Sequence, residues 1–489
     1  MFNLKGFNKY NNYKKGFLIV YVMFSIIIAL TTLNTSDIRI LAIISLLQLI
    51  GNVLVIIVST SKKISVSVIF VILSYITHLG HLLLNGLEID ARIPAVFDTI
   101  KIFPMDTYLT ANKYTIYSNI FLVLGIMLYN AFYVKNKMNH ASLKKYNNCN
   151  EKDDLVILKK IGRMFVIIGI VPMIYTNYTR LSLYTSGQHG YRSTFDFNPT
   201  GVSNVLSNMF TFGMIAIMIS NKYNVRKARN TLFLVILIST ITMFSGNRFM
   251  AVMLIVTIVI VYVKAVEKPK VKIIWGFGVL SYALLIFINF LSDFRSQRFG
   301  SFDYSKILVD YFSVLNSPIF DAIGEFGVTM STLCYSTIIF PQLRPFGYGI
   351  TYLVGPLTIF PNIFNVFGHI DKYLLFVKDF PLNYKEGLGG SYLGELYFNF
   401  GNYGMFMTIF IGAFFAHFDR KIAINIENRF WIKLFIYISN IPFIFMWTRG
   451  YYRELFRTMF WQYLLVMFIY SCAKNKISSK EGALCRKSV

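Results

Sequence analysis

The stretch GFLIVYVMFSIIIALTTL, residues 16–33, contains no charged residue. A helix needs about 20 mostly apolar residues to cross the hydrocarbon core of a bilayer, so this stretch predicts a membrane-spanning helix. Four lysines precede it, as in a signal peptide. However, the run is long for the apolar part of a signal peptide and no small-x-small cleavage site follows it. We therefore interpret it as a retained first span.

The composition extends this prediction to the whole chain. Hydrophobic residues make up 55% of the 489 residues and charged residues only 15%, whereas soluble domains carry about a quarter charged residues. The net charge of +25 resembles that of a nucleic-acid-binding protein. In a membrane protein the position of the charges matters more than their sum, and we expect no nucleic acid partner.

Comparable apolar runs predict an all-α, polytopic transmembrane helix bundle with about twelve spans. They lie near residues 16–33, 40–60, 64–84, 114–134, 162–179, 201–220, 231–245, 249–263, 273–292, 391–416, 434–447 and 455–472.

The distribution of basic residues predicts the orientation of these spans. Cytoplasmic loops are enriched in Lys and Arg. When the N-terminus is placed in the cytoplasm, every loop that falls on the cytoplasmic side is basic. These segments contain Lys62 and Lys63, the cluster 135–163, residues 222–229, 264–272 and 420–433, and the Lys-rich C-terminus. Both termini are therefore predicted to be cytoplasmic.

The predicted outer face is poor in lysine but retains many arginines. Arginine donates paired hydrogen bonds to phosphate or carboxylate and stays charged when partly buried. The alternative is that each arginine snorkels at a helix end and pairs with a local acid. The predicted outer arginines are Arg39, Arg92, Arg180, Arg192, Arg248, Arg295, Arg298, Arg344, Arg449, Arg453 and Arg457.

The spans divide the chain into three regions. Residues 1–292 hold spans one to nine, residues 293–390 form a large structured outer segment, and residues 391–489 hold spans ten to twelve and a basic tail. The outer segment contains half of the chain's 12 prolines and many aromatic residues. Within it, 303–315 predicts a short amphipathic helix. Residues 326–340 are too few to span and should lie in the interface or dip into the protein.

Four predicted outer turns carry candidate substrate-binding residues. Each could bind a diphosphate or a sugar, and each could instead hold local ion pairs. The first turn has Asn247 and Arg248, which follow Ser245, and the second has Arg449, Tyr451 and Arg453, which precede Glu454. The third has Arg295 and Arg298 at the start of the outer segment, and the fourth has Arg180 and Arg192 on either side of His189.

The sequence GLGGSYLGE, residues 387–395, leads into the predicted tenth span. Its glycines allow a close backbone approach or a sharp entry turn. Glu395 falls about one turn inside an apolar helix, where an ionisable residue is costly and indicates function. Glu395 could act as a general base on a sugar hydroxyl, or it could be a structural carboxylate paired with arginine. Ser391 precedes it as a further binding candidate.

Other patterns are weaker. His78 and His81 share one face of the third span, which we interpret as the polar lining of a cavity, and the acidic pair Glu88 and Asp90 gives little indication. The four cysteines lack metal-ligand spacing. The sequence contains no P-loop or nucleotide-binding fingerprint, so we expect no cofactor.

The plan of spans, the Ser245–Arg248 turn and the sequence from Gly389 through Glu395 to Gly401 resemble the O-antigen polysaccharide polymerase (Wzy) family over nearly the whole chain. This resemblance implies a multi-pass glycosyltransferase of the bacterial cytoplasmic (inner) membrane. It would polymerise undecaprenyl-diphosphate-linked repeat units at the outer leaflet into O-antigen, capsule or exopolysaccharide. A chain-length regulator protein is a further candidate partner.

The resemblance implies a base for the acceptor hydroxyl and cations for the leaving diphosphate. We assign the first role to Glu395, with His189 or His369 as weaker candidates, and the second to Arg298 and Arg449. Because arginines can neutralise a diphosphate, we expect no metal. Two alternatives remain: an O-antigen ligase or single-sugar lipid-linked glycosyltransferase, and a lipid-linked oligosaccharide flippase or transporter.

Overall fold

The computed structural model describes residues 4–60, 65–91, 98–136, 148–185, 201–244, 248–267, 318–360 and 389–487, with a few positions between 276 and 286. All regular structure in these ranges is helical, as predicted. The first half comprises α1 (Leu4–Asn34), α2 (Ile38–Thr60), α3 (Val66–Gly86), α4 (Thr99–Ile102), α5 (Met105–Asn136), α6 (Asn148–Thr185), α8 (Gly201–Ser220), α9 (Val225–Phe244), α10 (Arg248–Val261) and η4 (Tyr262–Val266). The second half comprises α13 (Pro318–Gly327), α14 (Met330–Ile339), α15 (Ile350–Val354), η5 (Gly355–Ile359), α18 (Tyr392–Phe400), η7 (Gly401–Tyr403), α19 (Gly404–Glu427), α20 (Trp431–Ile438), α21 (Ile441–Met446), η8 (Trp447–Arg449) and α22 (Tyr452–Lys487).

Within the described residues, seven helical segments are long and apolar enough to cross a membrane. They are Gly16–Asn34, Ile38–Thr60, Val66–Gly86, Met105–Phe132, Arg248–Val266, Trp431–Arg449 and Tyr452–Ala473. Each overlaps a predicted span, so the chain is a multi-pass membrane protein. The full count of about twelve stays a prediction, as do the cytoplasmic termini, and most of the predicted span 273–292 lies outside the described residues.

One predicted span is wrong as drawn. Residues 391–416 were expected to form a single helix, but α18 ends at Phe400 and α19 begins at Gly404. The break occurs because Gly401 has a positive φ of 57°, a conformation that glycine adopts at little cost and that ends a helix. A side chain there would also collide with the Phe346 ring. The break leaves α18 as a separate short helix.

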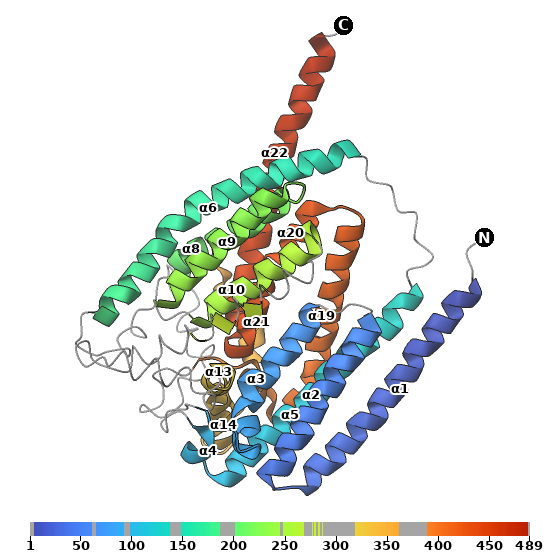
Figure 1. The fold of residues 1–489 in the computed structure, drawn as a ribbon, viewed down its shortest axis with the longest axis vertical. Helices are drawn as coiled ribbons and strands as arrows, with labels where there is room; N and C mark the ends of the chain where they lie inside the picture. Colours follow the sequence, from blue (N-terminus) through green and yellow to red (C-terminus); the bar gives the residue numbers. More distant parts are fainter. Residues whose placement is uncertain are drawn as a thin grey trace.

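The long helices pack in two groups. Figure 1 shows α1, α2 and α5 beside α19 on one side of the molecule, and α6, α8 and α9 on the other. The contact between α5 and α19 is unusually close, because a Cβ atom at Gly412 would lie 1.9 Å from the Leu122 carbonyl oxygen. Small residues permit such backbone contact between membrane helices. α19 is thereby fixed against the N-terminal group.

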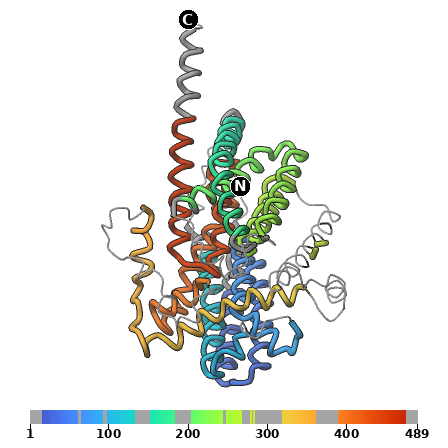
Figure 2. The backbone as a smooth tube through the Cα atoms, turned by 90° about the vertical axis from the view of Figure 1, so that its left-hand side faces the viewer, coloured from blue at the N-terminus to red at the C-terminus, as the bar shows by residue number. Residues whose placement is uncertain are grey.

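The first part of the segment 318–360, with α13 and α14, runs across the long helices in the lower half of Figure 2. Its helix α14 packs against α3, α5 and α18, and Met330, Leu333 and Cys334 are fully buried there. Of the two predicted placements for residues 326–340, burial within the protein is therefore confirmed. The segment then turns so that α15 and η5 lie along α22. The predicted helix 303–315 lies outside the described residues.

Candidate active site

Glu395 lies in the first turn of α18 and is almost completely buried, with 1% of its surface exposed. The helix begins after Ser391, whose hydroxyl accepts a 3.0 Å hydrogen bond from the Gly394 N–H. A serine at this position satisfies one of the backbone donors that a helix leaves unpaired at its start. Ser391 therefore fixes where α18 starts, and with it the direction of the Glu395 side chain.

The Glu395 carboxylate is held at the amino terminus of α22. Its Oε2 atom accepts a 2.9 Å hydrogen bond from the backbone N–H of Tyr452, the first residue of that helix. Unpaired N–H groups and the helix dipole stabilise a negative charge at such a place. Thr351 of α15 also lies beside this carboxyl group. Three elements that are distant in the sequence thus converge on one acidic group.

The two glycines before Ser391 allow this convergence. A Cβ atom at Gly390 would lie 2.6 Å from the carbonyl carbon of Gly450, closer than real side chains allow. A Cβ atom at Gly389 would lie 3.3 Å from the Cγ atom of Arg449. The predicted close backbone approach is therefore confirmed, and it brings the arginine-rich turn against the start of α18.

Two arginines of α22, Arg453 and Arg457, follow Arg449 in the chain. Arg453 interacts electrostatically with the Glu395 carboxyl group, and its guanidinium carbon lies 5.9 Å from the centre of the Tyr451 ring. Arg457, one turn further along the helix, interacts electrostatically with Glu454 and with Arg453. Sequence reasoning did not propose Arg457 as a binding residue, although its i, i+4 spacing from Arg453 places both on one face.

Ser391 has a structural partner. Its hydroxyl lies 2.8 Å from the Nε2 atom of His78, and both side chains are buried. This hydrogen bond joins α3 to α18. His81 is likewise buried, with its Nε2 atom 2.7 Å from the Gly324 carbonyl oxygen. Both histidines therefore connect elements of the protein, and neither makes the metal pair that their spacing allows.

Two of the predicted binding arginines lie in other surroundings. Arg248 is buried at the start of α10, and its Nη1 atom lies 2.9 Å from the Glu325 carboxylate on α13. Arg180 lines a small cavity of about 90 Å³ among α6, α8, α9 and α10, with polar neighbours that include Asn177 and Ser239.

The remaining predicted site residues lie outside the described residues. They are Arg192, His189, Asn247, Arg295 and Arg298, together with the weaker candidate His369.

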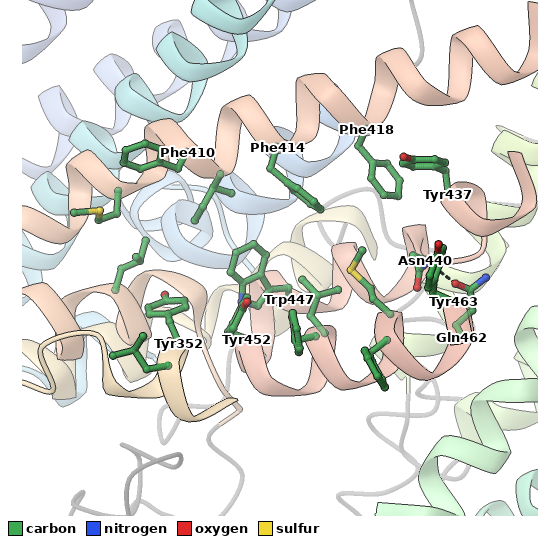
Figure 3. Close-up of a pocket in the computed structure, with 18 of the residues that line it drawn as sticks. Tyr352, Phe410, Phe414, Phe418, Tyr437, Asn440, Trp447, Tyr452, Gln462 and Tyr463 are labelled. Atoms are coloured by element: carbon green, nitrogen blue, oxygen red, sulfur yellow. Dashed lines mark hydrogen bonds between the residues drawn. The ribbon is translucent and has the colours of Figure 1, made fainter. Parts of the chain in front are cut away.

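A large apolar groove runs beside Glu395. It lies between α19 and the two helical segments Trp431–Arg449 and Tyr452–Ala473. Its volume is about 1120 Å³. Figure 3 shows aromatic side chains of α19, including Phe410, Phe414 and Phe418, facing Trp447 and Tyr452 across the groove. The part of the groove beside Tyr452 adjoins the acidic group, because Tyr452 donates its backbone N–H to Glu395. We call this part the head end.

The groove is open to the surroundings of the bundle. Among its lining residues, Leu353 is 75% exposed and Phe410 is 70% exposed. At the end opposite Glu395 the lining includes Lys433 and Tyr437. This exposed apolar surface leaves room for an apolar chain to enter the groove from the side of the bundle.

No metal-binding cluster is found among the described residues: these ranges contain no group of three or more His, Cys, Asp or Glu side chains placed to hold an ion. The positive groups of the turn that precedes and begins α22 are the arginines Arg449 and Arg453.

Comparison with known proteins gave one family. The family model described as O-antigen polysaccharide polymerase Wzy matches residues 16–478, nearly the whole chain. Comparison with the curated proteins and with the solved structures gave no match.

Proposed function

Because the chain belongs to the O-antigen polysaccharide polymerase Wzy family, we propose that it joins undecaprenyl-diphosphate-linked repeat units at the outer leaflet of the bacterial cytoplasmic membrane. The product would be O-antigen, capsule or exopolysaccharide. One observation carries the proposal for this chain: a buried carboxylate, Glu395, interacts electrostatically with Arg453 and is hydrogen-bonded by Tyr452, a residue that lines the apolar groove.

The shape and apolar lining of the groove favour a lipid-linked substrate. Such a molecule combines a long isoprenoid chain with a charged diphosphate and polar sugars. An apolar groove open to lipid binds the chain by removing it from contact with polar groups, while the few polar groups at one end fix the orientation of the substrate. The isoprenoid would lie between α19 and α22, with the diphosphate at the arginine-rich end.

The proposed reaction is a single displacement at the anomeric carbon of the donor sugar. The oxygen of an acceptor sugar hydroxyl forms a bond to this carbon, while the bond from the carbon to the phosphate oxygen breaks. Glu395 takes the proton of the acceptor hydroxyl, as a general base within hydrogen-bonding reach. The bonding electron pair leaves with the diphosphate, which remains attached to the lipid.

The arginines stabilise the negative charge that develops on the leaving diphosphate. Groups already oriented toward this charge lower the barrier because they need little rearrangement during the reaction. We assign this task to Arg298 and Arg449, with Arg453 as a binding residue, because the planar guanidinium can donate two hydrogen bonds to one phosphate. Arg295, Arg180, Arg192 and Arg248 stay proposed binding residues, as do His189, Asn247, Ser391 and Tyr451.

We expect the reaction to proceed without a metal ion, since guanidinium groups can neutralise the diphosphate. Full activity of the purified protein in excess chelator is the expected result. Abolition of activity by the chelator, with recovery on adding a divalent cation, would contradict this expectation.

The proposal is tested with the purified protein in detergent. The substrate is the lipid-linked repeat unit extracted from cells that lack this chain, and the products are resolved by gel electrophoresis. A polymerase produces a ladder of lipid-linked oligomers with no other protein present. Because detergent leaves no bilayer to cross, a transporter would produce no ladder.

A ligase is distinguished in cells. Loss of a polymerase leaves a single repeat unit on the final acceptor, whereas loss of a ligase leaves finished polymer on the lipid carrier. We expect the first pattern when the chain is deleted. The second pattern, together with the absence of a ladder in detergent, would overturn the proposed function.

A further inference from the structure

Two polar side chains of α3 hold the residues at which α18 begins. Ser74 and His78 are four residues apart, so they lie on one face of α3. The Ser74 hydroxyl lies 2.7 Å from the hydroxyl of Tyr392. The Nε2 atom of His78 lies 2.8 Å from the hydroxyl of Ser391. All four side chains are buried, so one face of α3 fixes two consecutive residues at the start of α18.

The hydrogen bonds of His78 assign the proton of its ring. The Nδ1 atom lies 3.2 Å from the Ser74 carbonyl oxygen, which can only accept, so Nδ1 carries the proton. In the neutral ring, which burial favours, Nε2 is then an acceptor. The Ser391 hydroxyl therefore donates to Nε2, while its oxygen accepts from the Gly394 N–H at 3.0 Å. His78 has to supply an acceptor at this point for Ser391 to keep both bonds.

The residue that His78 holds sets the position of the proposed base. Glu395 follows Ser391 by one turn, and its backbone N–H donates to the Ser391 carbonyl oxygen at 2.8 Å. Ser391 is therefore bonded to the first turn of α18 through both its side chain and its backbone. A shift or rotation of this turn moves the Glu395 carboxylate directly, because that side chain projects from the same turn.

The position of this carboxylate matters for the proposed transfer. A general base acts only within hydrogen-bonding reach of the proton that it takes. Misplacing a reacting group by about 1 Å can cost on the order of 100-fold in rate. Hydrogen bonds that lock the surroundings of the base can thus support the rate without touching the substrate. His78 is buried, does not line the groove, and makes such a bond.

We propose that His78 is a positioning residue for the glycosyl transfer, which acts through Ser391 to hold the Glu395 carboxylate within reach of the acceptor hydroxyl. This inference rests on the proposed function, because it needs Glu395 as the base. It makes the rate of transfer depend on one acceptor nitrogen in α3, in addition to the groups that meet the substrate.

The test compares His78→Ala with His78→Gln. Alanine removes the ring nitrogens, whereas the amide oxygen of glutamine can again accept from the Ser391 hydroxyl. The purified variants are assayed for elongation of the extracted lipid-linked repeat unit, and kcat and KM are measured separately. We expect kcat of His78→Ala to fall on the order of tenfold with little change in KM, since the groove is unaltered. His78→Gln should recover most of this loss.

His81→Ala is the matched control. His81 is also a buried histidine of α3, but its Nε2 atom lies 2.7 Å from the Gly324 carbonyl oxygen of α13. This variant should lose stability in thermal unfolding to a similar extent and keep the wild-type kcat per folded molecule. An equal fall in kcat for the two alanine variants, or no recovery with His78→Gln, would contradict the positioning role. If His78→Ala fails to accumulate, His78→Phe keeps a ring without the acceptor and should show the same loss.

A double variant tests whether His78 acts through the base. If it does, adding His78→Ala to Glu395→Gln should not lower the residual rate further, because the two changes remove one function. An additional fall of about tenfold would mean that His78 acts by another route.

The outcomes separate this inference from the proposed function. Wild-type kcat in His78→Ala, with Glu395→Gln impaired, would overturn the positioning role and leave the proposed function standing. Wild-type elongation by Glu395→Gln would remove the base and, with it, the positioning role. Absence of a ladder from the wild-type protein would overturn the proposed function itself.

Discussion

The carboxylate of Glu395 accepts a hydrogen bond from the backbone N–H of Tyr452 at 2.9 Å, across 57 residues of sequence. This contact joins the start of α18 to the start of α22 and places a buried acid at a helix amino terminus. The same hydrogen bond is expected if Glu395 serves only as a structural cap for the start of α22. The neighbouring arginines and the groove favour a chemical role, and a substitution that keeps the cap but removes the base distinguishes the two.

Glu395→Gln makes that distinction. The glutamine side chain has a similar shape, and its carbonyl oxygen can still accept the Tyr452 N–H, but it cannot take a proton at neutral pH. We expect the variant to fold and insert normally and to lose elongation by about 100-fold or more. Normal polymer from this variant would show that the carboxylate is a cap alone. Elongation by purified protein and thermal unfolding provide the two measurements.

Arg449→Ala and Arg298→Ala should each abolish polymer while the protein remains in the membrane. Removing one group that stabilises the developing charge costs about 100-fold or more in rate. Substitution by lysine should restore little activity, because a point charge cannot reproduce the paired donors of the guanidinium. Polymer length on gels and immunoblots of membranes measure the two effects.

Arg39→Ala is the matched control for these arginines. Arg39 is exposed and forms an ion pair with Glu88, far in sequence from the proposed site. Exposed ion pairs contribute little to stability, so this variant should produce polymer of wild-type length. Equal loss in all three variants would indicate that outer arginines act through general charge and not through a site.

Shortening the aromatic side chains of the groove should weaken binding of the lipid chain. For Phe410→Ala combined with Phe414→Ala, we expect the KM for the natural long-chain substrate to rise about tenfold, from lost apolar contact. The KM for an analogue with a short isoprenoid should change little. Phe468→Ala is the control, because Phe468 is 65% exposed on α22 outside the groove. An unchanged KM for the long-chain substrate in the double variant would argue against the groove as its binding site.

A second buried acid, Glu151, predicts a pH dependence of stability. Burial alone would raise its pKa, but hydrogen bonds from Lys222, Tyr223, Arg429 and Trp431 lower it to about 2. Its folded-state pKa therefore lies below the unfolded value of about 4.3. The stability that Glu151 provides is present above pH 4.3 and is lost as the pH falls toward 2.

Glu151→Gln tests this dependence. The variant should be less stable than the wild type by about 3 kcal/mol near pH 6, the effect of breaking a buried ion pair. The difference between their melting temperatures should shrink as the pH is lowered from 5 to 3. A difference that stays constant over this range would mean that the glutamate contributes through packing and not through its charge.

Local sequence patterns anticipated a good part of this molecule. Apolar runs such as residues 16–33 predicted the helices, since burial in lipid depends on composition and length alone. A charged residue within an apolar run drew attention to Glu395, and the neighbouring glycines predicted a close backbone approach. The clustering of Arg449 and Arg453 in one short turn was equally visible, because these residues are neighbours in the chain.

The tertiary structure alone decided which of these features meet. Three features depend on residues far apart in the chain: the contact of Glu395 with Tyr452, the pairing of Arg248 with Glu325, and the groove between α19 and α22. Composition and periodicity carry information about one segment and its solvent. A contact between distant segments depends on how helices pack and where they break, as at Gly401, and it leaves no periodic trace in the sequence.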